Sequence, residues 1–237
     1  MTQIYEKDLL VQYGHCDVFD RMKLSYILKE AQQLRMEHCD LLGIGSYYLK
    51  SLNMVFLLAK LKVTIHALPK GGQKLHLVTC PTLPARAQYM RFTHMRLLDG
   101  TPMVDVDSRW VLVDTNTHKI FRKVPEQLEL PFPPPDRIDD FRMPRLNDYA
   151  PAGDFRVQYS NLDSNQHMNN AEYADVVANL LSDQLMQGKP VRELEFYYHN
   201  EATLGEKISL FTCQQDDTFF VRGMLDNTMC FESIVRF

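Results

Sequence analysis

Tyr13-Gly-His-Cys-Asp17 has a counterpart in Tyr159-Ser-Asn-Leu-Asp163, which lies 146 positions further along the chain. The same spacing aligns Met22 with Met168. Each motif is followed by one amphipathic stretch and then by several segments in which apolar residues alternate. The order of signals is therefore the same in both halves of this 237-residue chain, and it predicts a duplicated fold.

Two further sets of matches support the duplication. Six residues between positions 66 and 80 recur 133 positions later, between positions 199 and 213. Leu98-Asp-Gly-Thr101 and Leu225-Asp-Asn-Thr228 then provide each half with a hairpin turn, since Asp-Gly and Asp-Asn supply the positive φ that such turns need. The spacing between matching residues falls from 146 at the first motif to 133 at positions 66–80. This decrease predicts a longer helix-to-strand connection in the first half.

The elements expected from periodicity are one long helix and several strands in each half. The first helix is expected from about Ser25 to Leu42, where Gly43 ends it. The second is expected to start at Asn169, with Glu172 completing a capping box. Strands are expected at 56–66, 75–80, 89–98, 103–113, 194–199, 208–213, 219–225 and 229–237. This composition predicts an α+β fold, a tandem arrangement in which each antiparallel sheet wraps around one helix.

The proline-rich stretch that begins Leu130-Pro-Phe-Pro-Pro-Pro-Asp136 is typical of an extended connector. We therefore divide the chain into an N-terminal repeat at residues 1–130, a connector at 131–151 and a C-terminal repeat at 152–237.

Composition excludes several classes of protein. A net charge of -4 and a pI near 6.1 argue against a dedicated nucleic-acid binder. The five cysteines are odd in number and form no C-x-x-C pair, which favours a reducing compartment over a disulfide framework or a zinc ribbon. The longest apolar run, Met54 to Ala59, is too short to span a bilayer. We expect a soluble, cytoplasmic protein with no membrane span.

The densest polar cluster lies between Asn161 and Asn170, immediately before the second helix. In an extended segment, Asp163, Asn165 and His167 would point to the same side. The helix start offers amide hydrogens for a polarised carbonyl, so Asn169 and Asn170 are candidate substrate-binding residues, although both are also common cap and turn residues.

This cluster does not match a metal site. The fifth position of a calcium loop is occupied by His167, the required glycine is missing, and Ala174 stands where the bidentate glutamate belongs. A single histidine with no nearby thiolate does not predict zinc. We therefore expect no metal and no cofactor.

The segment Asn161-Leu-Asp-Ser-Asn-Gln-His-Met-Asn-Asn-Ala-Glu-Tyr173 resembles the D-x-N-x-H-x-N-N-x-x-Y signature of the acyl-acyl carrier protein (acyl-ACP) thioesterases of plastids and bacteria. Supporting matches are Ser108-Arg-Trp-Val-Leu-Val-Asp114 with Arg122, and Glu195-Phe-Tyr-Tyr-His-Asn-Glu201. The resemblance covers nearly the whole chain. It implies a tandem hot-dog fold and hydrolysis of fatty acyl-ACP to free fatty acid and ACP, which ends chain elongation in fatty-acid biosynthesis.

The resemblance also implies site residues. The family's catalytic Asp, Asn and His fall on Asp163, Asn165 and His167, and its acidic residue on the following strand falls on Glu201. Plastid members have Cys after that glutamate, whereas this chain has Ala202. The chemistry of these residues agrees, because thioester hydrolysis needs an activated water or a carboxylate nucleophile, donors for the oxyanion and a proton route to sulfur. Either Asp163 or Glu201 could act as base or nucleophile.

Two other functions are compatible with parts of the pattern, and a third is not. The same site could hydrolyse acyl-CoA, and a non-catalytic acyl-binding protein would share the fold and the apolar content. A double hot-dog dehydratase would need H-x-x-x-G-x-x-x-x-P, which none of the histidines opens. Any acyl chain length is compatible with the sequence, as is either a monomer or a homodimer.

The acyl chain is expected in the interior of the first repeat, near an apolar run that could equally be ordinary core. Its residues are Met54, Val55, Phe56, Leu57 and Leu58. The acidic carrier protein needs a local basic face on this acidic chain. The candidates for it are Lys119, Arg122 and Lys123, with Arg137, Arg142 and Arg145 of the connector.

The first repeat is expected to have lost its own site. By the two spacings, Asp163, Asn165, His167 and Glu201 correspond to Asp17, Phe19, Arg21 and Leu68. One carboxylate remains and the other groups are gone, which predicts a single active site per chain.

Overall fold

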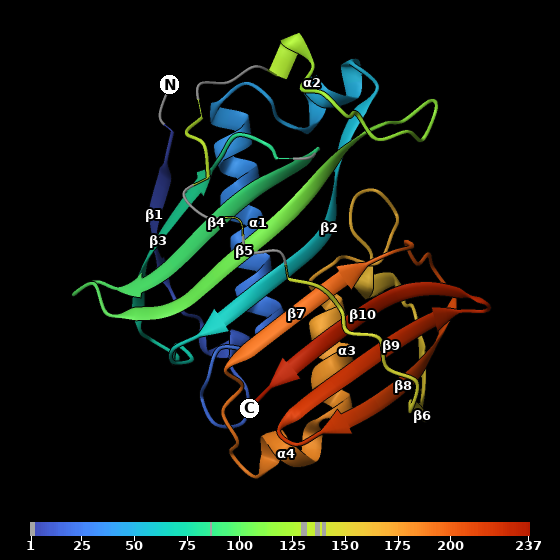
Figure 1. The fold of residues 1–237 in the computed structure, drawn as a ribbon. Helices are drawn as coiled ribbons and strands as arrows, with labels where there is room; N and C mark the ends of the chain where they lie inside the picture. Colours follow the sequence, from blue (N-terminus) through green and yellow to red (C-terminus); the bar gives the residue numbers. More distant parts are fainter. Residues whose placement is uncertain (1–2, 86, 129–131, 136–137, 139–140) are drawn as a thin grey trace.

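A computed structural model describes the chain except for residues 1–2, 86, 129–131, 136–137 and 139–140. Its described residues form one ten-stranded antiparallel sheet (Figure 1). The strands are β1 (Tyr5–Leu10), β2 (Met54–Ile65), β3 (Lys74–Pro81), β4 (Gln88–Leu97), β5 (Pro102–Asp114), β6 (Ala150–Arg156), β7 (Glu193–Tyr198), β8 (Lys207–Gln215), β9 (Thr218–Leu225) and β10 (Thr228–Arg236). The strand ranges expected from alternation are confirmed to within about two residues.

The strand order reads the same from either edge once the repeats are aligned. The order is β1-β3-β4-β5-β2-β7-β10-β9-β8-β6, so β2 and β7 are the two strands that join the halves. Lys62 pairs with Glu195 in this antiparallel ladder, and the two residues also correspond by the 133-residue spacing. The pseudo-two-fold axis between the repeats therefore passes through this pair.

Helices α1 (Leu24–Leu41) and α3 (Glu172–Leu180) lie on the same face of the sheet and contact each other (Figure 1). Gly43 adopts a φ of 74° just after the first helix, as a helix stop requires. The short helix α2 (Ser46–Ser51) occupies the longer connection predicted in the first half, and α4 (Ser182–Met186) follows α3. The sheet thus wraps one long helix in each half.

The core lies between the helices and the sheet and crosses the junction of the repeats. Ile27 and Leu34 of α1 and Val177 of α3 are fully or almost fully buried, as are Phe196 and Phe231 of the second-half strands. Burial of this continuous apolar layer holds the two repeats together as one body.

The connector crosses the opposite face of the second half before it enters β6 (Figure 1). Phe141, Met143, Leu146 and Tyr149 pack there on Tyr197, Cys213, Phe220 and Ile234. The boundary expected at residues 130 and 131, and Arg137, lie outside the described residues.

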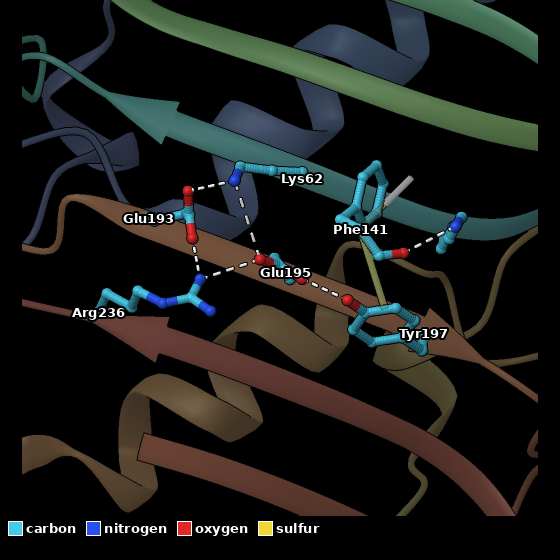
Figure 2. A network of polar contacts seen from close by, with 7 residues as sticks. Lys62, Phe141, Glu193, Glu195, Tyr197 and Arg236 are labelled. Atoms are coloured by element: carbon cyan, nitrogen blue, oxygen red, sulfur yellow. Dashed lines mark hydrogen bonds and ion pairs between the residues drawn. The ribbon is translucent and has the colours of Figure 1, made fainter. Parts of the chain in front are cut away.

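The residues at the junction of the repeats form a charged network, which Figure 2 shows. Glu195 is 3% exposed and accepts hydrogen bonds from Tyr197 Oη and from Arg236 Nη1, the latter at 2.9 Å. Lys62 pairs with Glu193 and lies 3.9 Å from Glu195. Opposite charges thus face each other at equivalent positions of the two repeats.

The predicted capping box at the second helix is wrong. Helix α3 begins at Glu172 with Ala171 in the cap position, and no side chain caps it. The Asn169 side chain accepts the Ala171 amide instead, at 2.9 Å. Glu172 does not reach back, because its carboxylate pairs with Lys29 of α1 at 2.7 Å and accepts from Asn161 Nδ2 at 3.2 Å.

Candidate active site

The polar segment before α3 is a tight turn. The amide of Asp163 donates to the His167 carbonyl at 2.8 Å, and Gln166 has a φ of 69°. The expectation that this segment is extended is therefore wrong. A turn still brings Asp163, Asn165 and His167 together, because its closure places the first and last of them on adjacent strands of backbone.

Asp163 holds this turn through its own carboxylate. Oδ1 accepts the amide of Asn165 at 2.8 Å and the amide of His167 at 3.3 Å, while Asn165 Nδ2 lies 3.4 Å from Oδ2. The carboxylate is thus engaged in a side-chain-to-backbone turn of the kind that Asp commonly forms. Its oxygens position the backbone that carries Asn165 and His167.

His167 and Glu201 form the pair that the sequence places 34 positions apart. Nδ1 of His167 lies 3.2 Å from Oε2 of Glu201, with side chains that are 33% and 53% exposed. Two backbone links hold the turn to the loop after β7: a bridge between His167 and Thr203, and a hydrogen bond from the Met168 amide to the Ala202 carbonyl at 2.8 Å. Backbone contacts between the loop before α3 and the loop after β7 therefore position His167 and Glu201 next to each other. Both side chains are open to solvent.

The start of α3 offers fewer free amides than expected. The Ala171 amide is taken by the Asn169 side chain and the Glu172 amide by the Asn169 carbonyl. The Asn170 carbonyl accepts a hydrogen bond from Tyr198 Oη at 2.8 Å. Asn169 and Asn170 thus stabilise the entry to the helix.

The corresponding loop of the first repeat has the same backbone and different side chains. The Asp17 amide donates to the Arg21 carbonyl at 2.7 Å, and Asp17 Oδ1 accepts the amides of Phe19 and Arg21, both at 2.9 Å. Arg21 Nη2 closes an ion pair onto Asp17 at 2.9 Å and its guanidinium lies over the Phe19 ring. Leu68 occupies the position of the glutamate. Only the second loop combines a histidine with a second carboxylate.

Two family profiles match this chain in tandem. The acyl-ACP thioesterase N-terminal domain matches residues 2–130, and the acyl-ACP thioesterase C-terminal domain matches residues 147–227. This protein belongs to the acyl-ACP thioesterase family. The thioesterase is accordingly a thioester hydrolase, and the fatty-acyl-ACP reaction expected from the resemblance is confirmed at the level of the family.

Solved structures agree on the fold. An acyl-ACP thioesterase from Bacteroides thetaiotaomicron superposes with a TM-score of 0.90 at 20% identity, over 99% of this chain and 97% of that one. The 12:0-ACP thioesterase from Umbellularia californica gives 0.84 at 14% identity, over 100% and 97%. The tandem hot-dog prediction is confirmed by these matches. No curated protein sequence matches the chain.

Two features near the site were not singled out in the sequence. Lys29 reaches it from the first repeat through its ion pair with Glu172, a contact between helices that no local pattern indicates. Cys230 is fully buried beside the loop after β7, where its thiol lies 3.5 Å from Tyr173 Oη. Burial raises the pKa of Cys230 to about 11, so this thiol is protonated and is no ready nucleophile.

The apolar run in β2 divides between two faces. Phe56 lines a cavity of about 360 Å³ beneath α1 in the first repeat, whereas Met54 and Leu58 are buried in two adjoining core clusters. Val55 and Leu57 alternate with these residues and point to the other face of the sheet.

The candidate carrier face also has a definite place. Lys119, Arg122 and Lys123 line a groove together with His118. This groove shares Pro84, Tyr89 and Val124 with the cavity beneath α1. The basic residues therefore lie at one margin of this cavity.

Among the described residues, no three His, Cys, Asp or Glu side chains are grouped so that they could hold a metal ion. In the same residues, none of the helices has the length and apolar character needed to span a membrane.

Proposed function

We propose that the thioesterase hydrolyses acyl-ACP at a single active site in the second repeat, with His167 and Glu201 as its acid-base pair. The observation that carries the proposal is the 3.2 Å contact between these two side chains, for which the first repeat has only Arg21 and Leu68. A positioned histidine is the group that most often serves as a general acid-base catalyst, and this reaction needs one to activate water and to protonate the leaving sulfur.

The proposed reaction assigns one task to each residue. Glu201 holds Nδ1 of His167, so Nε2 takes a proton from water as the oxygen attacks the thioester carbonyl carbon. Collapse of the tetrahedral intermediate breaks the C–S bond, and the same nitrogen returns the proton to the leaving sulfur. Asn165 positions the water, and Asp163 is a positioning residue that holds the turn.

We propose that the acyl chain extends into the first repeat along the apolar run of β2, where Phe56 borders the cavity. Chain-length preference is the property that tests this path. Substitution of Phe56 by Ala should shift the preferred chain length, whereas a change in stability with an unchanged preference would remove Phe56 from the path.

The carrier protein is proposed to dock on the basic groove. Reversal of charge at Lys119, Arg122 and Lys123 should raise the KM for acyl-ACP and reduce its dependence on salt, because the carrier is acidic. An unchanged KM would exclude this face. The five cysteines are free thiols, which supports a reducing compartment such as the cytoplasm.

The decisive experiment measures release of free thiol from acyl-ACP and from acyl-CoA over a series of chain lengths. The proposal expects a higher kcat/KM for acyl-ACP and loss of turnover in a His167→Ala variant that melts normally. Equal or better use of acyl-CoA would overturn the carrier assignment, and full activity of the variant would overturn the site.

A further inference from the structure

The cavity beneath α1 contains two arginines where an acyl pocket needs none. Arg35 comes from α1 and Arg91 from β4, and both line the cavity. Their guanidinium groups converge on one thiol: Arg35 Nη1 lies 4.0 Å and Arg91 Nη2 lies 3.7 Å from Cys39 Sγ. Arg91 is 6% exposed, so one of the two charges is almost completely removed from solvent.

Among the described residues, no carboxylate lies within ion-pair distance of either arginine, although the Asp40 carboxylate attracts Arg35 from further away. Arg91 donates instead to His38 Nδ1 at 3.0 Å and to Thr79 Oγ1 at 3.3 Å. Arg35 lies over the Trp110 ring with its Cζ 4.2 Å from the ring centroid. Burial lowers the pKa of Arg91 to about 10, which still leaves it charged at neutral pH. Two like charges are therefore held close together with no carboxylate in ion-pair contact within the described residues, an arrangement that is costly in an apolar interior.

Unused hydrogen-bond donors lie in the same wall. Arg35 Nε and Tyr89 Oη are buried and have no hydrogen-bond partner within the described part of the chain. Both residues line the cavity. Buried donors are nearly always paired in proteins, so the unpaired Arg35 Nε and Tyr89 Oη beside the Arg91 charge indicate a ligand that brings oxygen acceptors.

Most of the remaining lining is apolar. Ile44, Phe56, Leu83, Val124, Leu128 and Phe132 surround the arginines in a cavity of about 360 Å³, which is within the size range of small-molecule sites. The fitting ligand thus has an alkyl body and one anionic oxygen group.

We propose that this cavity binds an alkyl carboxylate, with the carboxylate on Arg35 and Arg91 and the chain against the apolar wall. The basic groove that shares Tyr89 with the cavity gives an anion an attractive approach. The carboxylate has two sources: a free fatty acid, or the terminal carboxyl of an acyl chain whose thioester lies at the second repeat. Only the second source rests on the proposed function.

Binding can be measured without turnover because Trp110 lines the cavity and is the chain's single tryptophan. Titration with monomeric decanoate should change Trp110 fluorescence saturably, and 1-decanol should bind at least about tenfold more weakly, since it lacks the charge-assisted bonds. Arg35→Met should remove this preference. Arg96→Met, on the same strand as Arg91 but outside the cavity lining, is the matched control and should bind like the parent.

Arg91→Met should also remove the preference for decanoate over decanol, and it is interpreted only if its melting curve shows a folded protein. Arg35→Lys should retain part of the preference that Arg35→Met loses. Equal affinity for decanoate and decanol in the parent, or an unchanged preference in Arg35→Met, would overturn the proposal.

The source is decided by kinetics. If the terminal carboxyl is the ligand, the parent hydrolyses 10-carboxydecanoyl-ACP with a lower KM than decanoyl-ACP, and Arg35→Met loses that advantage. If the free acid is the ligand, decanoate inhibits and the carboxylated substrate has no advantage. If the parent protein binds decanoate but does not hydrolyse acyl-ACP, the result would count against the active site of the second repeat. It would leave the assignment of this cavity in place.

Discussion

The loops at residues 17–21 and 163–167 have nearly the same backbone and different chemistry. Each is closed by an amide-to-carbonyl hydrogen bond between its ends, at 2.7 Å and 2.8 Å. Asp20 and Gln166 occupy the same left-handed position, with φ values of 61° and 69°. In one loop an arginine closes onto the aspartate, and in the other a histidine turns to Glu201.

This comparison separates a structural aspartate from the proposed catalytic pair. Asp17 makes the same two backbone hydrogen bonds in a loop that has no histidine. The hydrogen bonds of Asp163 therefore belong to the fold of the repeat, and they would be present with or without catalysis. What distinguishes the second loop is the contact between His167 and Glu201.

The largest expected effect tests that distinction directly. Alanine at Asn165, His167 or Glu201 should lower kcat by about 10²-fold or more, the scale of losing a positioned acid-base group. Alanine at Phe19, Arg21 or Leu68 should leave kcat near that of the parent. Steady-state hydrolysis with a melting curve for each variant makes the measurement. A well-folded first-repeat variant that loses kcat would show that the two loops are not functionally distinct.

The second prediction concerns the junction, where the two repeats carry opposite charges. Lys62→Met leaves Glu193 and the buried Glu195 with Arg236 as their only cation in the network (Figure 2). Removal of one partner of a partly buried charge cluster should cost about 1–3 kcal/mol of unfolding free energy. Urea unfolding of the parent and of Lys62→Met measures this loss of free energy.

The control for the junction is Lys74→Met, since Lys74 is exposed at the start of β3. A loss of stability no greater than in this control would mean that the charge pair on the pseudo-two-fold axis is not a stabilising feature.

The third prediction sharpens the role of the two aspartates. Asp17→Ala and Asp163→Ala each remove a side-chain acceptor for two amides, so both should lose about 1 kcal/mol of stability, as at helix caps. Only Asp163→Ala should also lower kcat, by about tenfold, because it displaces Asn165 and His167. Unfolding curves and kcat are compared for the pair. An unchanged kcat in Asp163→Ala would show that the turn keeps its shape without the Asp163 carboxylate.

The smallest expected effect is a difference between the repeats in how the free energy of unfolding depends on pH. His66 and Asp105 form a pair at 2.8 Å in the first repeat, and His199 and Glu232 form the corresponding pair at 3.2 Å in the second. A hydrogen bond with Asp105 raises the pKa of His94 to about 9, and that bond with His94 lowers the pKa of Asp105 to about 2.

The stability from this cluster is fully present between the ordinary pKa values of Asp and His, about 3.9 and 6.5. It is lost as the pH rises through 9, where the raised His94 deprotonates, and as the pH falls through 2, where Asp105 is protonated. These side chains are about one-third exposed, so the effect of Asp105→Asn should be at most about 1 kcal/mol at pH 6.

Urea unfolding at pH 6 and pH 10 measures the difference. Asp105→Asn should cost less at pH 10 than at pH 6, whereas Glu232→Gln should change less with pH because Glu232 also pairs with Arg222, which stays charged. If the loss of unfolding free energy in Asp105→Asn were independent of pH, the result would contradict a stabilising ion pair between His94 and Asp105.

The duplication, eight of the ten strands, the first long helix and the polar segment before α3 could all be predicted from the sequence. Hydrophobic period, turn residues and helix stops such as Gly43 are local properties, and they are read from neighbouring positions. The same locality explains the errors. The capping box at Asn169 and Glu172 and the extended form of Asp163 to His167 each assume that neighbours in sequence are partners, whereas Glu172 is engaged by Lys29 of the other repeat.

The sequence by itself thus determined that two similar halves exist, and that only the second retains a histidine and a glutamate at the corresponding positions. The tertiary structure decided which of these groups meet: His167 with Glu201, Lys62 with Glu195, and Arg35 with Arg91 around one cavity. Such contacts depend on strand order and register, and a shift of one residue would send each strand's side chains to the other face. No local pattern carries that information, because burial across the whole sheet selects the register.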